Sequence, residues 1–161
     1  AITASSSAKG SACAMNLLLD TNVFIDYLGR KQPFFEDARN IVAAGFFGDT
    51  KLWVPAQSAT DAFYVLSRYV TAEKLQESLL RAFDIIEPVS LSADDLRRAA
   101  RLRWDDYEDC LIALAADKAH ADYLITRDAR GFSRSPVPAL SPPDWLGLMR
   151  ESGLVYDEVE I

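Results

Sequence analysis

Residues that bind soft metals or form cross-links are scarce in this chain of 161 residues, which has two cysteines and one histidine. Cys13 lies close to the beginning, and Cys110 falls inside an apolar pattern of helical spacing. This arrangement gives no sign of a disulfide framework or a zinc site. We interpret Cys110 as a small buried thiol, the common role of a free cysteine. A reducing cytoplasm is the compartment that fits this cysteine usage.

Long apolar runs are also missing. No stretch approaches the ~18 apolar residues that a membrane-spanning helix needs, and residues 1–14 lack the apolar segment of ~7–15 residues that marks a signal peptide. The length is sufficient for one domain with a substantial core. We expect residues 1–14 to be a leader or disordered tail ahead of a natural start at Met15, residues 15–150 to form one domain, and residues 151–161 to form an acidic tail.

Positive charge is in deficit, because 17 lysines and arginines face 24 acidic residues, giving a net charge of −7. This balance argues against a protein that binds nucleic acid by overall attraction, since phosphate contacts need Lys and Arg. Two interpretations remain. Clustered carboxylates can hold divalent cations, which then supply the positive charge, or the partner is a basic protein segment.

Short apolar runs alternate with segments in which apolar residues recur every three or four positions. Leu17 to Leu19 form a continuous run, whereas Phe34, Ala38 and Ile41 share one helical face. This alternation predicts an α/β fold, a three-layer α/β/α sandwich with a mostly parallel central sheet. The predicted strands cover residues 17–19, 52–54, 85–89, 123–126 and 137–140; the predicted helices cover residues 23–29, 33–47, 57–70, 72–83, 92–102, 110–116 and 141–150.

Four aspartates occupy positions that a parallel sheet brings to one edge. Asp20 ends the first predicted strand and Asp128 follows a late one, while Asp61 and Asp109 lie in the first turns of helices. Sites in such sheets form at the carboxyl ends of the strands, and a carboxylate at the top of a buried helix is costly unless capped, paired or metal-bound. Mg²⁺ prefers hard oxygen ligands. The pattern therefore indicates metal-assisted phosphodiester hydrolysis.

Each acid also has a purely local interpretation, because acidic residues are favoured at helix starts. Asp20 alone is compatible with a helix cap as well as with a site residue. The other local roles are a capping-box partner of Ser58 for Asp61, a neighbour of an Asp106 cap for Asp109, and a turn before Gly131 for Asp128; Asp105, Glu108, Asp117 and Asp122 are expected to face solvent.

Four motifs, in order and at their spacing, resemble those of PIN-domain proteins, the nuclease fold of many toxin–antitoxin toxins. The similarity extends from Met15 to about Arg150 and ends in a proline-rich segment before Trp145. The motifs are Leu18-Leu19-Asp20-Thr21-Asn22-Val23, Ser58-Ala59-Thr60-Asp61-Ala62-Phe63-Tyr64, Tyr107-Glu108-Asp109-Cys110-Leu111-Ile112-Ala113 and Tyr123-Leu124-Ile125-Thr126-Arg127-Asp128.

The resemblance implies a ribonuclease that depends on Mg²⁺ or Mn²⁺, with Asp20, Asp61, Asp109 and Asp128 as its catalytic acids. Asp20, Asp109 and Asp128 would bind the metal. The more familiar members have Glu where this chain has Asp61, so the ion would lie closer to that helix or be reached through water. The supporting residues implied are Asn22, which would orient Asp20 through its amide, Thr126 for the metal shell, Asp106 as an accessory acid, and Arg127 and Arg130 for substrate RNA.

The resemblance also implies a homodimer and a small antitoxin partner that inserts a basic residue into the acidic site, which suits the net charge of −7. Two rival functions stay open. One is a catalytically weak PIN module that binds or assembles other molecules. The other is a different Mg²⁺ enzyme on a similar sheet, such as a phosphatase or a receiver, although Asn22 and Arg127 stand where those proteins want Asp and Lys.

Overall fold

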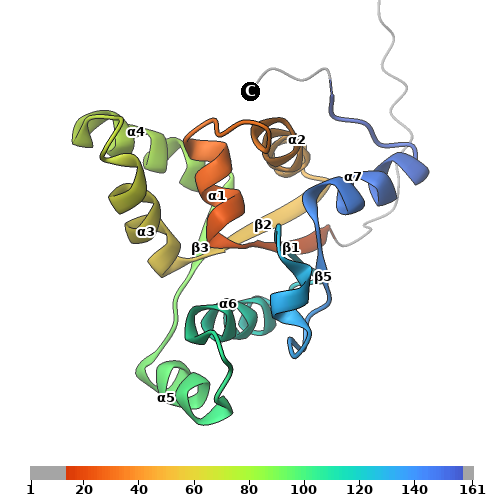
Figure 1. Ribbon diagram of the computed structural model, residues 1–161. Coiled ribbons are helices and arrows are strands. Elements are labelled where there is room, and N and C mark those ends of the chain that lie inside the picture. Colours follow the sequence, from red (N-terminus) through yellow and green to blue (C-terminus); the bar gives the residue numbers. More distant parts are fainter. Residues whose placement is uncertain (1–13, 158–161) are drawn as a thin grey trace, which may run out of the picture.

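A computed structural model describes residues 14–157, so that most of the predicted leader and residues 158–161 lie outside the described part. Five parallel strands form one sheet in the order β3-β2-β1-β4-β5. The strands are β1 (Met15–Leu19), β2 (Thr50–Pro55), β3 (Ile86–Val89), β4 (Tyr123–Ile125) and β5 (Ala139–Leu140). The predicted α/β class with a parallel central sheet is confirmed (Figure 1).

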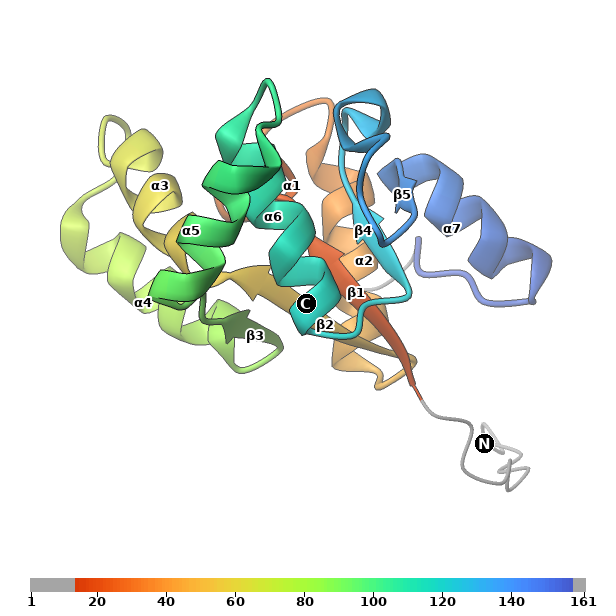
Figure 2. The same cartoon turned by 90° about the horizontal axis from the view of Figure 1, so that it is seen from below.

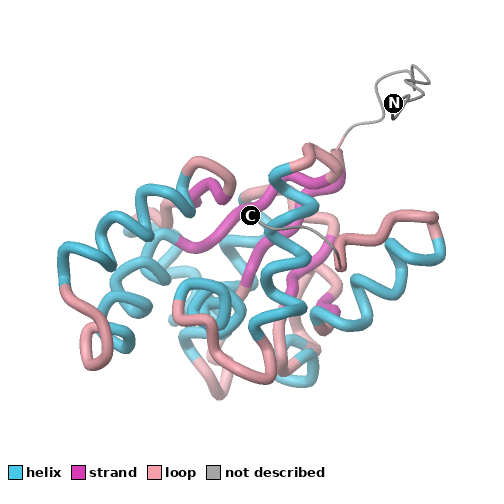
Figure 3. Tube along the Cα trace, turned by 90° about the horizontal axis from the view of Figure 1, so that it is seen from above, coloured by secondary structure: helices cyan, strands magenta, loops and turns pink. Residues whose placement is uncertain are grey.

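Helices cover both faces of this sheet. They are α1 (Thr21–Leu28), α2 (Phe35–Phe46), α3 (Ala56–Leu66), α4 (Ala72–Phe83), α5 (Ala93–Leu102), α6 (Tyr107–Lys118) and α7 (Pro142–Glu151), with a short 3₁₀ helix, η1 (Ala129–Phe132). Buried residues of α1, α2, α3, α4 and α7 join one core, and Figure 3 shows the backbone from above, the side on which these helices lie. On the other face α6 packs on the sheet and α5 lies outside it (Figure 2).

The alternation of strand side chains explains why the second half of β1, Leu17 to Leu19, is a continuous apolar run. Leu17 and Leu19 belong to the core beneath α1 and α2, whereas Leu18 belongs to the core beneath α6. Successive side chains of a strand point to opposite faces, so a strand buried on both faces reads as a continuous apolar run. The central strand β1 therefore delivers its next residue, Asp20, to the carboxyl edge from a fully buried position.

The segment after α7 returns to the domain. Tyr156 is 4% exposed and its hydroxyl donates a hydrogen bond to Asp49 Oδ2 at 2.9 Å. Asn40 Nδ2 donates to Asp157 Oδ1 at 3.3 Å. Part of the predicted acidic tail thus packs against α2 and the turn that follows it. Within residues 14–157, every helix is too short or too polar to span a membrane.

Candidate functional site

Asp20 and Asp128 meet because β1 and β4 are parallel neighbours in the sheet. The backbone N–H of Asp20 donates to the Ile125 carbonyl at 2.9 Å, which fixes the strand ends in register. Thr126 Oγ1 donates to Asp20 Oδ2 at 2.8 Å and accepts from the Asp128 N–H at 3.0 Å. Thr126 is fully buried and Asp20 nearly so. The hydroxyl of Thr126 therefore ties the two strand-end acids to one another.

Burial raises the pKa of the Asp20 carboxyl, opposed by the Thr126 hydrogen bond, by the nearby N–H groups of Thr21 and Asn22, and by the charge of Arg127. Asp20 occupies the N-cap position of α1, yet its side chain makes no capping hydrogen bond of ordinary geometry. The capping interpretation of Asp20 is therefore not supported. Among residues 14–157, the exposed Asn22 amide makes no hydrogen bond to Asp20. The side chain that holds Asp20 in the structure is Thr126, and the orienting role of the Asn22 amide stays a prediction.

Asp61 is brought to the same edge by α3, which begins directly after β2. Ser58 is fully buried, and its hydroxyl shares a hydrogen bond of 2.8 Å with the Thr21 hydroxyl. Ser58 lies inside α3, whose N-cap is Pro55, so it does not form a capping box with Asp61. The Thr21–Ser58 bond instead joins the first turns of α1 and α3. Asp61 is left free of the local role that the capping interpretation assigned to it.

Asp109 lies in the first turn of α6, where Asp106 is the N-cap and accepts from the Asp109 N–H at 3.0 Å. The capping role of Asp106 is therefore real, but it uses the backbone of Asp109 and not its carboxylate. Partial burial raises the pKa of Asp109 to about 6, with further contributions from Asp106, Asp20, Asp128 and Glu108. Neighbouring like charges disfavour the ionised form. The charges of these four acids therefore all act on the Asp109 carboxyl group.

Glu108 is exposed, as predicted, yet it also belongs to this group of acids. Burial raises its pKa, followed by the charges of Asp61, Asp106 and Asp20. The sequence prediction treated Glu108 as a solvent residue only. Its position between Asp106 and Asp109 in a first helical turn was the available signal, since α6 carries that whole turn to the sheet edge. We call Asp20, Asp61, Asp106, Glu108, Asp109 and Asp128 the acidic cluster.

Gly131 lies between two members of the acidic cluster. The side chain of Asp128 accepts from the Gly131 N–H at 3.4 Å and caps η1, so its predicted turn role is present. A Cβ atom on Gly131 would lie 3.0 Å from Asp109 Oδ2 and 3.2 Å from Asp128 Oδ2. Both carboxylate groups therefore approach the same backbone position, from α6 and from the segment after β4. The missing side chain leaves the space between them open.

Arg127 is engaged by a buried acid that the sequence analysis did not single out. Asp26 is 1% exposed; Arg127 Nε lies 2.9 Å from Asp26 Oδ2, and Nη2 lies 3.4 Å from Oδ1. The guanidinium also lies 4.1 Å from the centre of the Phe34 ring. Arg127 thereby anchors the segment between Thr126 and Asp128 to α1. Arg130, by contrast, is exposed at the start of η1.

The acidic cluster fits a hard divalent cation in its donor chemistry. All its donors are carboxylate oxygens, with the Thr126 hydroxyl behind Asp20, and Mg²⁺ prefers oxygen ligands. Among residues 14–157, no three such side chains converge closely enough to enclose an ion by themselves. This matches the habit of Mg²⁺ to take one or two carboxylates and keep several waters. The nearby cation, Arg127, is held by Asp26, so the repulsion around Asp109 is not neutralised by that contact.

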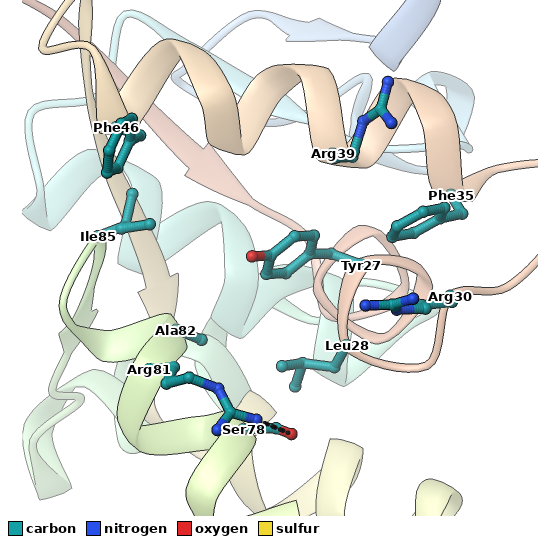
Figure 4. A pocket seen from close by; sticks show the side chains of 10 residues that line it. All are labelled: Tyr27, Leu28, Arg30, Phe35, Arg39, Phe46, Ser78, Arg81, Ala82 and Ile85. Carbon is teal, nitrogen blue, oxygen red and sulfur yellow. Dashed lines mark hydrogen bonds between the residues drawn. The ribbon is translucent and has the colours of Figure 1, made fainter. Parts of the chain in front are cut away.

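A second region lies away from these acids. A pocket of about 360 Å³ opens between α1, α2 and α4, and three of its lining residues are Arg30, Arg39 and Arg81 (Figure 4). The Tyr27 hydroxyl points into the pocket, toward the side where Ile85 and Ala82 lie. These residues include the last turn of α1, whereas Asp20 precedes its first turn. The arginine-lined pocket is therefore distinct from the acidic cluster.

Comparisons with known proteins agree with this architecture. One similar solved structure is VapBC2 from Rickettsia felis bound to a promoter DNA fragment, with 19% identity, a TM-score of 0.58, and coverage of 79% of this chain and 98% of that chain. A toxin–antitoxin complex from Klebsiella pneumoniae has 19% identity, a TM-score of 0.59, and coverage of 78% of this chain and 97% of that chain. FitAB bound to the IR36 DNA fragment has 21% identity, a TM-score of 0.54, and coverage of 78% of this chain and 94% of that chain. No curated protein matches. A family model for the PIN domain matches residues 16–130. The chain therefore belongs to the PIN domain family.

Proposed function

We propose that the protein is a metal-dependent endoribonuclease that hydrolyses RNA phosphodiester bonds and acts as the toxin of a toxin–antitoxin pair. The observation that carries this proposal is the gathering of unneutralised acids around Asp109, whose pKa is raised to about 6 by partial burial first and then by the charges of Asp106, Asp20, Asp128 and Glu108. Such a cluster weakens the fold unless it serves a ligand, because uncompensated charges are costly when withdrawn from water. Membership of the PIN family supports a nuclease role.

In this proposal Asp20, Asp109 and Asp128 hold Mg²⁺ or Mn²⁺, and Asp61 contributes through water from α3. Thr126 keeps Asp20 oriented by its hydrogen bond of 2.8 Å, and burial in the sheet edge prevents that carboxylate from turning away. Asp106 fixes the first turn of α6 and so the direction of Asp109. When bound, the ion would lower the pKa of a coordinated water and neutralise charge on the phosphate. Arg130 is exposed beside the cluster and is proposed to contact RNA phosphate.

The test is cleavage of a structured RNA by the purified protein in Mg²⁺ or Mn²⁺, with and without EDTA. Loss of a metal-binding acid should reduce cleavage at least ~10³-fold, or roughly 4 kcal/mol of barrier, so Asp20→Asn and Asp109→Asn should be nearly inactive. Asp117→Asn, an exposed acid farther along α6, is the matched control and should cleave normally. Equal trace activity in wild type and all three variants would refute the proposal.

A homodimer and an antitoxin belong to the same proposal. Tyr64 is 68% exposed and Tyr69 81% exposed, with Val65 and Val70 beside them, so the end of α3 presents an apolar surface. Large exposed apolar patches mark interaction sites, and we propose that a second copy covers this one. One of the three similar structures is a toxin–antitoxin complex. Sedimentation of the chain alone and of the Tyr69→Lys variant measures the association between two copies. Sedimentation of the chain mixed with the product of an adjacent small gene measures the association with an antitoxin.

A catalytically weak PIN module that only binds RNA or protein is the second candidate. It is favoured by the shorter Asp61 and by the lack, within the described residues, of three side chains that enclose an ion. In that case Mn²⁺ binding should be undetectable at millimolar concentrations and equal in wild type and Asp128→Asn. The ribonuclease proposal instead expects measurable Mn²⁺ affinity that falls at least about tenfold in Asp128→Asn.

A further inference from the structure

A groove of about 340 Å³ lies beside the acidic cluster. It is lined by Pro33, Phe34, Asp37, Arg127, Ser141, Pro142 and Pro143, which come from the approach to α2, the segment after β4 and the start of α7. Ser141 directly follows β5 and Arg127 directly follows Thr126, so the groove opens at the carboxyl edge of the sheet. This is the edge that carries Asp20 and Asp128.

Arg127 belongs to the wall of the groove and to the surroundings of the acidic cluster. Its charge lowers the pKa of Asp20, and it stands between Thr126 and Asp128 in the chain. Nε and Nη2 contact Asp26, whereas Nη1 makes no hydrogen bond to any of the residues 14–157. A guanidinium carries five N–H donors. Arg127 can therefore be anchored by Asp26 and still donate to a ligand that enters the groove.

The remaining walls combine apolar surface with one acceptor. Phe34 and the prolines at 33, 142 and 143 supply rings, and Asp37 supplies carboxyl oxygens in the first turn of α2. Proteins recognise single-stranded RNA by placing unstacked bases against aromatic side chains or guanidinium planes, and by hydrogen-bonding the base edges. The volume lies within the range of small-ligand sites. An apolar wall with an acid and an arginine matches a base joined to a phosphate.

We propose that this groove holds the base of one unpaired nucleotide next to the scissile phosphate, with Asp37 accepting from an amino group of the base. The inference rests on the proposed ribonuclease function. Adenine, cytosine and guanine carry exocyclic amino groups, whereas the only base donor of uracil, N3–H, lies between two carbonyl oxygens. A carboxylate repels those oxygens. The groove therefore selects amino-bearing bases over uracil at one fixed position relative to the cut, and it selects single strands over duplexes.

Cleavage of a pool of short randomised single-stranded RNAs in Mn²⁺, followed by sequencing of the ends, tests the selection. Wild type should disfavour uridine about tenfold at one position beside the cut, equivalent to one good hydrogen bond to a charged group. Asp37→Asn should flatten that preference while still cleaving. Glu36→Gln removes a charge from the same helical turn but does not line the groove, so it should retain the wild-type profile.

A second measurement uses binding in EDTA, where no cleavage occurs. Anisotropy of a labelled single-stranded RNA should show that Pro143→Leu, which extends an aliphatic side chain into the groove from the exposed second position of α7, weakens binding about tenfold. Cleavage by wild type with a flat profile shared by Asp37→Asn, or binding unchanged in Pro143→Leu, overturns the groove assignment and leaves the ribonuclease intact. Absence of cleavage by wild type overturns the proposed function and with it this inference.

Discussion

Two carboxyl groups at the same end of the molecule are treated in opposite ways. Asp26 is 1% exposed and meets the Arg127 guanidinium at 2.9 Å. Asp109 is only partly buried, makes no ion pair with the described residues, and faces other acids. Burial raises the pKa of both groups, but only for Asp26 is a cation in contact the main opposing influence. The charge of Asp26 is compensated within the fold by Arg127, whereas the charge of Asp109 has no compensating cation among the described residues.

This difference distinguishes an acid that stabilises the fold from an acid that is available to bind a ligand. A buried ion pair that loses one partner leaves an uncompensated charge, which is strongly destabilising. A cluster of like charges gains stability when one charge is removed, since repulsion disappears with it. Replacing Asp26 and Asp109 by the same residue should therefore move stability in opposite directions. The same comparison distinguishes an anchoring acid from a ligand-binding acid without any knowledge of the substrate.

The largest effect on stability is expected for Asp26→Asn. This change leaves the Arg127 guanidinium without its carboxylate, and the free energy of unfolding should fall by about 3 kcal/mol, the usual cost of breaking a buried pair. Urea denaturation measures it. The segment from Thr126 to Asp128 should loosen as well, because Arg127 is what ties it to α1. Weaker Mn²⁺ binding in this variant would report that loosening.

The control for this prediction is Asp94→Asn, which breaks the exposed pair between Asp94 and Arg97, also at 2.9 Å. Exposed pairs contribute ~0–1 kcal/mol, so unfolding should change little. The double variant Asp26→Leu with Arg127→Met removes both charges and should recover part of the lost stability. If the Asp26→Asn and Asp94→Asn variants had equal free energies of unfolding, burial would add nothing to the stability of the Asp26–Arg127 pair. That result would refute the contrast drawn between Asp26 and Asp109.

The sheet and the strand-end acids could be predicted from sequence because they depend on local patterns. Leu17 to Leu19 form an apolar run that ends in Asp20, and the Thr126-Arg127-Asp128 segment repeats that arrangement after a second strand. Parallel neighbours then place the two ends together. Asp109 was found in the same way, from a carboxylate that precedes a helix apolar on nearly all sides.

The partnerships within the site could not be predicted, because they join residues that are distant in the chain. Asp26 lies on a helix where a polar residue usually faces solvent, and its partner is 101 residues away. Ser58 precedes Asp61 by the spacing of a capping box, yet the start of α3 at Ala56 places it inside the helix and against Thr21. Asn22 and Thr126 both offered a polar group for Asp20, and only the strand register decided in favour of Thr126.

A smaller effect, of opposite sign, is expected for Asp109→Asn in metal-free buffer. The pKa of Asp109 is about 6 in the folded protein against an ordinary value of 3.8, so between those values the folded state holds a proton that the unfolded state has released. The ionisation of Asp109 therefore lowers the free energy of unfolding progressively as the pH rises from about 4 to 6, and the whole loss of stability persists above that range.

Removing this carboxylate should stabilise the metal-free protein at pH 7.5 by about 1 kcal/mol after allowance for solvent screening, or about 2–4 °C in Tm. The gain should shrink as the pH falls and reach zero below about pH 3, where Asp109 is protonated in both the folded and the unfolded state. Thermal melts of wild type and variant across this pH range measure it, with Asp117→Asn as the control of unchanged slope.

Mn²⁺ at saturating concentration should raise the Tm of wild type more than that of the variant, because binding to the folded state stabilises it in proportion to affinity. A variant that is less stable than wild type at pH 7.5 would mean that Asp109 is compensated within the fold as Asp26 is, and it would remove the reason to assign the acidic cluster to a cation.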